Sequence, residues 1–350
     1  MRLSVVIRSK DEADRLRLTL ASLEGQAGLD EVVAVDDGSL DHTGAVLADA
    51  AVRLPLAVVR HAQPKGRAGA SNAGARAARG DVLVFLDGDT LAGPDFARRH
   101  KAFHAEGEGR IGRGETWHLR ATRFLKDPET GAPQPEHAER LARAPAAERE
   151  RMRVTLAQVR GDFAAVAARA EAGIYPGAGP RLLQEIELAA LRETPDCEVA
   201  WAAACGSNLS VRREAFLAAG GFDEGIDINE HRELALKLCT AGARMGLVPG
   251  AASYHLTHRS GWRDPLTYTD WEAAFFRAHP IPAVGLLAVF WASLSPGSPV
   301  PEAARIRNLP ELAAAARGER GVDYDAVRAR LGLAPLNLMA RLAAAGETAV

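Results

Sequence analysis

The chain has 350 residues, of which 47% are hydrophobic and 25% are charged, and these are ordinary proportions for a globular protein. Its formal net charge of -2 at pH 7 provides no overall field that would attract nucleic acid or an anionic membrane, so we expect no nucleic-acid partner. The three cysteines form no Cys-x-x-Cys pair and leave one over, which is typical of a protein from a reducing compartment.

One apolar stretch, Ile281 to Leu294, raises the question of a membrane span. A helix needs roughly 18 to 20 apolar residues to cross a bilayer. This stretch is shorter, and Pro282 interrupts it near its start, so it predicts a buried or interfacial helix. Because no charged-then-apolar leader precedes the first strand-like segment either, we expect a cytoplasmic protein, with peripheral membrane contact left open.

The first hundred residues alternate between two periodicities. Short β-branched apolar runs predict buried strands at Leu3–Ile7, Glu31–Val35, Leu56–Val59 and Val82–Leu86. Helical spacing of apolar or small residues predicts helices near residues 13–23, 41–48 and 68–78. Strands separated by helices of this length form parallel pairs with right-handed crossovers. The fold class is therefore α/β, and ligands of such a sheet bind beyond the carboxyl ends of its strands.

The pattern changes past about Trp117. Residues 118–198 combine a proline-rich polar stretch with a charged, Ala-rich helical run, and they predict a mostly helical insertion. A second ordered block follows Cys205, with an expected strand at Ser207–Val211 and an expected helix at His231–Thr240. The tail from Pro301 has a helical pattern and no chemical motif.

Polar clusters directly follow two of the expected strands. Asp36-Asp37-Gly38-Ser39 follows Val35, and Asp87-Gly88-Asp89 follows Leu86. Asp-x-Asp places two hard oxygen ligands near one divalent ion, and Mg²⁺ and similar ions are commonly held by one or two carboxylates plus substrate phosphates. Between the clusters lies the Gly-rich stretch Lys65–Gly74, which allows close backbone approach at a helix N-terminus that favours anions.

Each of these clusters also has a purely structural interpretation. Asp-Asp-Gly-Ser is often a turn with a helix cap, and Asp-Gly-Asp is usually a surface turn. A Gly-rich helix can simply pack closely on a sheet. The clusters nevertheless occur in order, each at a strand end of one alternating unit, and that order favours a nucleotide-binding and metal-binding site.

These motifs resemble those of the family 2 glycosyltransferases, which have a GT-A fold. The matching elements cover somewhat less than half of the chain, and individually they are weak but as an ordered set they are specific. They are Ser4–Glu12, Val35–Ser39, Gly69–Gly74 with Asn72 inside, Val84–Asp89, Gly206–Arg213, Gly220–Glu224 and Ala252–His258. The resemblance implies the following domains: 1–117, the nucleotide-sugar-binding half; 118–198, the helical insertion; 199–275, the acceptor-binding half; and 276–350, a helical extension.

The resemblance also implies roles for individual residues. Arg8 and Asp36 would line the base and ribose of the donor, and Asp87 would contact it. The other residues implied at the donor site are Asp37, Lys65, Asn72 and Gly88. Asp89 would bind Mn²⁺ or Mg²⁺ between the two phosphates. His255 would be a further metal or phosphate ligand with His258 as its rival, unless His255 is simply a packed histidine.

The expected general base departs from the family pattern. The family usually has Glu-Asp at the start of the helix that follows the Gly-Gly-Phe-Asp-Glu element, and here the pair is Glu230-His231. Three interpretations stay open: one of these two residues is the base, the acceptor needs no strong base, or activity is reduced. Glu230 could also be occupied in a capping box with Asp227.

The sequence therefore predicts a glycosyltransferase that moves a sugar from a nucleotide-sugar, more plausibly a UDP-sugar, to an acceptor hydroxyl with inversion and with help from a divalent metal. The acceptor, whether glycan, lipid-linked glycan, peptide or small metabolite, is not identified. The alternative is a catalytically weak, glycosyltransferase-like protein that binds a nucleotide-sugar or a partner. A nucleotidyltransferase or a dinucleotide oxidoreductase is disfavoured because no glycine follows the first strand.

Overall fold

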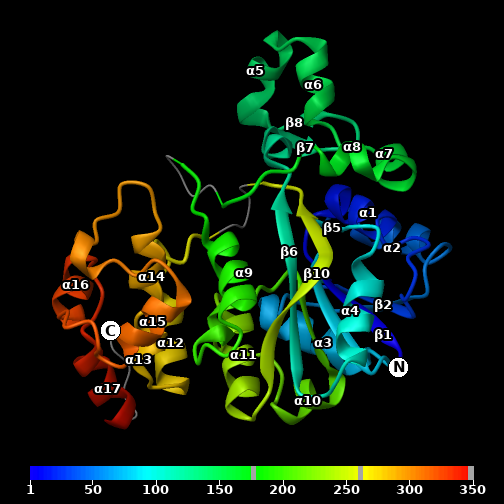
Figure 1. The fold of residues 1–350 in the computed structure, drawn as a ribbon. Helices are drawn as coiled ribbons and strands as arrows, with labels where there is room; N and C mark the ends of the chain where they lie inside the picture. Colours follow the sequence, from blue (N-terminus) through cyan, green and yellow to red (C-terminus); the bar gives the residue numbers. More distant parts are fainter. Residues whose placement is uncertain (175–178, 259–262, 346–350) are drawn as a thin grey trace. The chain divides into compact units, whose positions relative to one another are not determined.

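The computed structural model describes residues 1–174, 179–258 and 263–345 (Figure 1). They form two compact units. Unit 1 comprises Met1–Ala172, Cys205–Phe222 and Leu247–Trp262, and unit 2 comprises Gly173–Ala204, Asp223–Gly246 and Arg263–Val350. The segment 118–198 is therefore shared between the units, with residues 118–172 in unit 1 and residues 173–198 in unit 2.

An eight-stranded sheet in the order β3-β2-β1-β4-β9-β6-β10-β5 forms the centre of unit 1 (Figure 1). Its strands are β1 (Leu3–Ser9), β2 (Glu31–Asp36), β3 (Leu56–Arg60), β4 (Val82–Asp87), β5 (Thr90–Ala92), β6 (Arg110–His118), β9 (Leu209–Arg212) and β10 (Arg244–His255). β1 pairs in parallel with β2 and β4, and β2 pairs in parallel with β3, as the alternating pattern predicts. β9 runs antiparallel to β4 and β6, and β5 runs antiparallel to β10.

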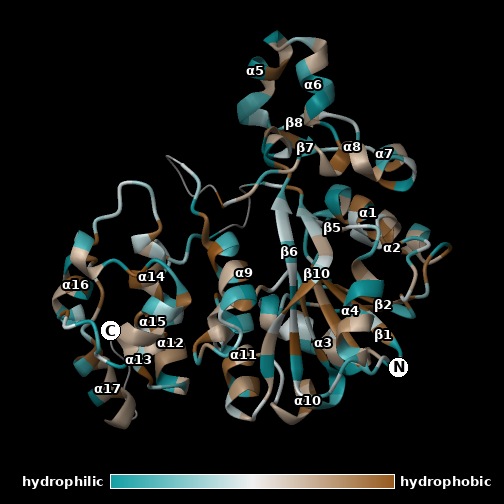
Figure 2. Cartoon of the chain, viewed as in Figure 1, coloured by the Kyte–Doolittle hydropathy of each residue, from teal (hydrophilic) through white to brown (hydrophobic). Residues whose placement is uncertain are grey.

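The register of the parallel strands aligns their carboxyl ends. Arg8 of β1 lies opposite Val35 on one side and Asp87 on the other, and Ser9 lies opposite Asp36. The side chains of Val5 and Ile7 in β1 are fully buried. In Figure 2 the strands at the centre of the sheet are largely hydrophobic, as expected for parallel strands covered on both faces.

Helices α1 (Ala13–Ala21), α2 (Thr43–Ala50), α3 (Gly66–Ala77), α4 (Phe96–Ala105) and α10 (Arg213–Ala218) accompany the sheet. The small residues of α3 allow close packing, because a Cβ on Gly74 would lie 2.5 Å from Cγ1 of Val6. The N-cap residue of α1 is Glu12, whose side chain makes no capping hydrogen bond. Instead Asp41 accepts a hydrogen bond from the backbone N–H of Ala13 at 3.0 Å.

The part of the insertion in unit 1 is mostly helical, as predicted. Its elements are η1 (Arg120–Phe124), β7 (Leu125–Asp127), β8 (Ala132–Pro133), η2 (Pro135–His137), α5 (Ala138–Arg143), α6 (Ala146–Met152), α7 (Leu156–Gly161) and α8 (Phe163–Ala167). The insertion is tied to α1, because the buried Arg15 donates to the carbonyl of Leu125 at 2.8 Å.

The regular structure of unit 2 is almost entirely helical in the residues that the structure describes. Its helices are α9 (Leu183–Glu193), η3 (Ala200–Ala203), α11 (Glu230–Thr240), α12 (Asp270–Ala278), α13 (Pro282–Gly285), α14 (Leu287–Ser293), η4 (Glu302–Ala304), α15 (Leu309–Ala316), α16 (Tyr324–Arg330) and α17 (Leu336–Ala345). Every residue of α14 is buried, which confirms a buried helix within the apolar stretch. None of the described helices is long and apolar enough to cross a membrane.

Candidate active site

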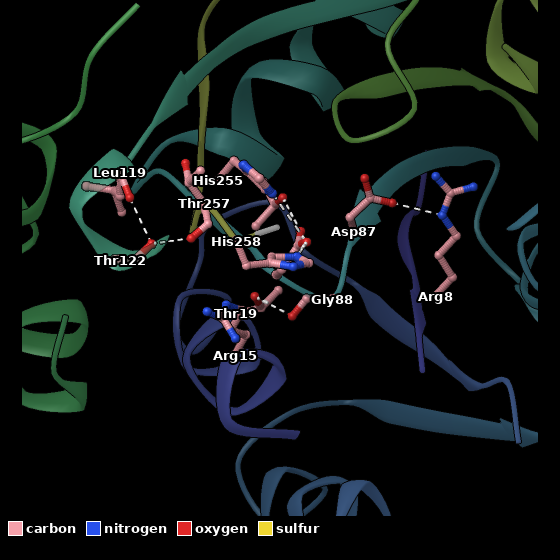
Figure 3. Close-up of polar contacts among 12 residues, drawn as sticks. Arg8, Arg15, Thr19, Asp87, Gly88, Leu119, Thr122, His255, Thr257 and His258 are labelled. Atoms are coloured by element: carbon pink, nitrogen blue, oxygen red, sulfur yellow. Dashed lines mark hydrogen bonds and ion pairs between the residues drawn. The ribbon is translucent and has the colours of Figure 1, made fainter. Parts of the chain in front are cut away.

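The carboxyl ends of β1 and β4 carry an ion pair between two of the predicted site residues. Nε of Arg8 donates to Oδ1 of Asp87 at 2.8 Å (Figure 3). The Arg8 guanidinium also lies 3.5 Å from the hydroxyl of Ser71 in α3. The pairing of β1 with β4 explains this contact, because it sets the two residues directly opposite each other.

A carboxylate and two imidazoles converge beside this pair. Oδ2 of Asp89 lies 2.6 Å from Nε2 of His258 and 3.3 Å from Nε2 of His255 (Figure 3). One ligand atom from each of the three residues fits within a cluster whose members are all within 4.8 Å of one another. Their side chains are 12%, 23% and 14% exposed for Asp89, His255 and His258. The cluster is therefore largely shielded from water yet still accessible.

Strand pairing brings these distant parts of the sequence together. His255, the last residue of β10, lies opposite Thr90 of β5 in the antiparallel ladder. The backbone N–H of Leu256 donates to the carbonyl of Asp89 at 2.8 Å. The Thr90 hydroxyl donates to Oδ1 of Asp89 at 2.9 Å, which leaves Oδ2 directed at the histidines.

The cluster shifts the pKa values of Asp89 and His255 in opposite directions. Burial by itself would raise the pKa of Asp89, but the facing His255 and His258 outweigh it and hold that pKa well below the ordinary value. Burial by itself would lower the pKa of His255, but the Asp89 carboxylate outweighs it and raises that pKa. The site therefore favours an ionised carboxylate that faces positive charge.

The donor atoms fit a divalent metal ion. Carboxylate oxygen with two imidazole nitrogens suits first-row transition ions such as Mn²⁺, whereas Mg²⁺ prefers oxygen ligands and water. The sequence named His255 as a ligand and His258 as its rival, and the structure brings both to Asp89. Gly88 leaves the space that this turn requires, because a Cβ there would lie 2.5 Å from Oε1 of Glu12.

Glu12 is a residue of this site that sequence reasoning did not single out. Burial, together with the negative charges of Asp89 and Asp87, raises the pKa of the Glu12 carboxyl well above its ordinary value. Thr19 was likewise missed, and its hydroxyl donates to the carbonyl of Gly88 at 2.9 Å (Figure 3). Both residues follow β1 in the sequence, and only the fold brings them to the Asp87-Gly88-Asp89 turn.

The aspartates after β2 have extensive local partners. Oδ1 of Asp36 accepts from the backbone of Ser39 at 3.0 Å. Asp37 accepts from the backbone N–H groups of Lys65 and Gly66 at 2.8 and 3.0 Å, and its Oδ1 lies 2.7 Å from Nδ1 of His61. Asp37 therefore shapes the start of α3, and the side chain of Lys65 remains exposed there.

Asn72 of α3 supports the turn that ends in Phe222. Its amide donates to the carbonyl of Phe222 and accepts from the backbone N–H of the same residue, both at 2.9 Å. Gly221 has φ 74°, and a Cβ there would lie 2.5 Å from Oδ1 of Asn72. The predicted donor contacts of Asp37 and Asn72 stay predictions, and each side chain has a clear architectural role.

The expected base pair opens α11 in unit 2. Glu230 is buried and is the first residue of the helix. A capping box from Asp227 to Glu230 is wrong, because Asn229 takes the N-cap position in the left-handed region with φ 74° and no side-chain cap. Glu230 therefore takes no part in a capping box.

Arg232 determines which nitrogen of His231 carries the proton. Its Nη1 lies 2.8 Å from Nε2 of His231, and an arginine can only donate hydrogen bonds. Nε2 of His231 must accept, so the neutral ring carries its proton on Nδ1, which lies 3.7 Å from Oε2 of Glu230. Arg232 is itself held by Glu187 of α9 at 2.7 Å.

An α/β sheet with acidic turns at its carboxyl edge places polar side chains where such sheets bind their ligands, and a carboxylate–imidazole cluster beside them can hold a divalent ion. Residues 4–111 match the family described as Glycosyl transferase family 2. This segment contains the motifs Ser4–Glu12, Val35–Ser39, Gly69–Gly74 and Val84–Asp89.

Known proteins resemble the chain over different spans. The uncharacterized glycosyltransferase YfnE of Bacillus subtilis is 27% identical over 268 residues, which are 74% of this chain and 66% of YfnE. The next two curated relatives are matched over only 31% and 25% of their own lengths.

Solved structures share the fold at low sequence identity. S. aureus TarS 1-349 in complex with UDP-GlcNAc is 14% identical with a TM-score of 0.54, covering 99% of this chain and 88% of that one. Mannosyltransferase PcManGT from Pyrobaculum calidifontis, in complex with GDP-Man and Mn²⁺, is 18% identical with a TM-score of 0.51, covering 100% and 76%. These similarities confirm the predicted α/β GT-A fold.

Proposed function

We propose that this protein transfers a sugar from a nucleoside-diphosphate sugar, a UDP-sugar in the first instance, to an acceptor hydroxyl with inversion at the anomeric carbon. The observation that carries the proposal is the convergence of Asp89, His255 and His258 directly after β4. The TarS complex with UDP-GlcNAc and the PcManGT complex with GDP-Man and Mn²⁺ support a nucleotide-sugar donor and a divalent ion.

The donor side of the site is proposed as follows. Asp89, His255 and His258 hold a divalent ion, either Mn²⁺ or Mg²⁺, with Mn²⁺ favoured by the two imidazoles. When bound, such an ion offsets the negative charge that develops on the departing diphosphate. Arg8 and Asp87 contact the donor as a pair, with Asp36 at the ribose and Lys65 near the phosphates. Asp37, Asn72 and Gly88 shape the walls of this pocket.

On the acceptor side, we propose Glu230 as the general base. Nε2 of His231 already accepts from Arg232 at 2.8 Å, so protonation at that atom would set two cationic groups against each other. Glu230 takes the proton of the acceptor hydroxyl as the new bond to the anomeric carbon forms and the bond to the phosphate oxygen breaks. A single displacement of this kind inverts the anomeric configuration. His231 then serves to orient the Glu230 carboxylate.

The decisive experiment is calorimetric titration of UDP, GDP and dTDP, each with Mn²⁺ and with EDTA. We expect one nucleotide, UDP, to bind only with Mn²⁺, and Asp89→Ala to lose that binding. Asp95→Asn is the control, because Asp95 is a half-exposed aspartate at the N-cap of α4 whose ion pair is with Arg98 of the same helix. Retained metal-dependent binding in Asp89→Ala would reject the metal assignment. The absence of binding to any nucleotide by the folded wild type would reject the proposed function.

The base assignment has its own test once a donor is identified. Glu230→Gln should reduce turnover by at least about 100-fold, since general base catalysis contributes roughly 10²- to 10⁴-fold, while leaving nucleotide affinity unchanged. His231→Gln should cost less than Glu230→Gln. The reverse order would transfer the role of base to His231, and full activity of both variants would favour an acceptor that needs no strong base.

A further inference from the structure

The segment that carries both histidines has a separate support in the insertion. His255 ends β10 and His258 follows three positions later. The two residues between them, Leu256 and Thr257, contact other parts of unit 1 through the backbone and through a buried side chain. These contacts decide where the two imidazoles point.

Two backbone hydrogen bonds fix the first part of this segment. The N–H of Leu256 donates to the carbonyl of Asp89 at 2.8 Å, and the N–H of Leu119 donates to the carbonyl of His255 at 2.9 Å. Leu119 immediately precedes η1 and lies at the start of the insertion. One end of the ligand segment is therefore attached both to Asp89 and to the insertion.

Thr122 fixes the second part of the segment. Its hydroxyl lies 3.0 Å from the carbonyl of Thr257 and 2.8 Å from that of Leu119 (Figure 3). The single hydroxyl proton of Thr122 is therefore shared between the carbonyls of Thr257 and Leu119, because a carbonyl oxygen has two lone pairs and that of Leu119 can also accept from the backbone N–H of Thr122 at 3.1 Å. Thr122 is only 1% exposed, and a buried hydrogen bond of this kind is shielded from competing water.

Leu256 anchors the segment in a hydrophobic cluster that the insertion helps to build. Leu256 is fully buried and packs with Leu119 and with apolar residues of α1 and β5. The insertion contributes Val154, Val159 of α7 and Val166 of α8 to the same cluster. The histidine segment therefore rests on a core shared between the sheet and the insertion.

We infer that Thr122 is a positioning residue for His258, and that the insertion sets the affinity of the Asp89–His255–His258 site for a divalent cation. By holding the Thr257 carbonyl, Thr122 fixes the peptide that leads into His258 and so directs its imidazole at Asp89. The inference rests on the proposed function, because it assumes that these three residues bind a metal. Groups that orient metal ligands typically alter metal affinity by about 10- to 100-fold when they are removed.

The test is the affinity of the nucleotide-free protein for Mn²⁺, measured by calorimetry and by the electron paramagnetic resonance signal of free Mn²⁺. Thr122→Val keeps the shape of the side chain and removes the hydroxyl, and we expect it to weaken Mn²⁺ binding about tenfold. Thr122→Ser keeps the hydroxyl, so its affinity for Mn²⁺ should lie within about twofold of the wild-type affinity. Thermal unfolding in EDTA shows whether both variants are folded at the titration temperature.

The outcomes separate the inference from the proposed function. Wild-type protein that binds no Mn²⁺ would reject the metal assignment itself. If the wild type binds Mn²⁺ and Thr122→Val binds it with equal affinity, the inference is overturned but the metal assignment stands. The same holds if Thr122→Ser binds Mn²⁺ as weakly as Thr122→Val does. If Thr122→Val does not fold, Leu256→Val takes its place. It loosens the anchor by one methylene and should weaken Mn²⁺ binding a few-fold, and unchanged affinity would again overturn the inference.

Discussion

Unit 1 contains two clusters that each combine two histidines with oxygen-bearing side chains, and the clusters have opposite electrostatic properties. In one, His255 and His258 face the carboxylate of Asp89 at an accessible edge of the sheet. In the other, His100 and His104 of α4 face Ser210 of β9 and Asn208, the residue before that strand, and are fully buried. The electrostatic difference arises because the histidines face a charged carboxylate in the first cluster and neutral side chains in the second.

The hydrogen bonds of the second cluster, called here the neutral cluster, can all form with both histidines uncharged. Nε2 of His100 must donate to the carbonyl oxygen of Asn208 at 2.9 Å. Nδ1 of His100 then accepts from the hydroxyl of Ser210 at 2.9 Å, and Ser210 in turn accepts from Nε2 of His104 at 2.9 Å. Burial lowers the pKa of His100 to about 4 and, with the help of His100, that of His104 to about 3. Of these two pairs, the one that faces a carboxylate is the candidate ligand set.

The largest expected effect of breaking the charged cluster is at Asp89. Asp89→Asn removes the charge that both imidazoles face and should lower the rate of sugar transfer at least about 100-fold, because stabilisation of charge by a metal is worth several kcal/mol. Steady-state rates with the donor identified by titration provide the measurement. A rate within tenfold of the wild type would show that Asp89 is not essential to the site.

Substitution of single histidines should separate the two clusters directly. His255→Asn and His258→Asn should each weaken Mn²⁺ binding by at least about tenfold, as expected when a ligand or its support is lost, with little change in stability. His100→Leu should leave Mn²⁺ binding unchanged but cost about 2 kcal/mol of unfolding free energy, because Asn208 and Ser210 lose a buried partner. Calorimetry and urea unfolding read out the two quantities. A His100 variant with impaired metal binding would contradict the separation.

The neutral cluster also predicts how stability depends on pH. Because the folded pKa values of His100 and His104 lie below the ordinary value of 6.5, the unfolded chain takes up protons first as the pH falls. Their contribution is fully present above pH 6.5 and is lost as the pH drops toward 4, by about 2 kcal/mol per histidine at pH 5. Urea unfolding at pH 7 and pH 5 measures the loss, and His100→Leu should reduce it. The same pH dependence in that variant would place its origin elsewhere.

The parallel half of the sheet could be predicted from the sequence, and the antiparallel half largely could not. The strands β1 to β4 consist of continuous apolar runs, and their order along the chain determines how they pair. β6 contains Arg110, Arg113 and two glycines, and β10 contains Pro249 and Gly250, so neither follows an apolar run. Arg113 is nevertheless fully buried, which no composition rule would suggest.

Within the candidate site, the sequence predicts the motif residues but not the residues that hold them in position. Asp87-Gly88-Asp89 stands out because it directly follows a strand, whereas Thr19 and Thr122 belong to segments with no motif. Their roles arise from contacts between residues 69 and 135 positions apart. The preference between His255 and His258 was left open for the same reason, since only the pairing of β5 with β10 shows that both face one carboxylate.

The spacing of His255 and His258 has a consequence for how this chain can vary. Leu256 and Thr257 are each attached at fixed points, so the loss or gain of one residue between the histidines would rotate one imidazole away from Asp89. In the connection between β8 and α5, by contrast, Pro135 and Glu136 are exposed, and a change in length at these two residues would cost little. Homologues that share this site should therefore keep His-x-x-His without gaps after the last strand, while their lengths differ between β7 and α6.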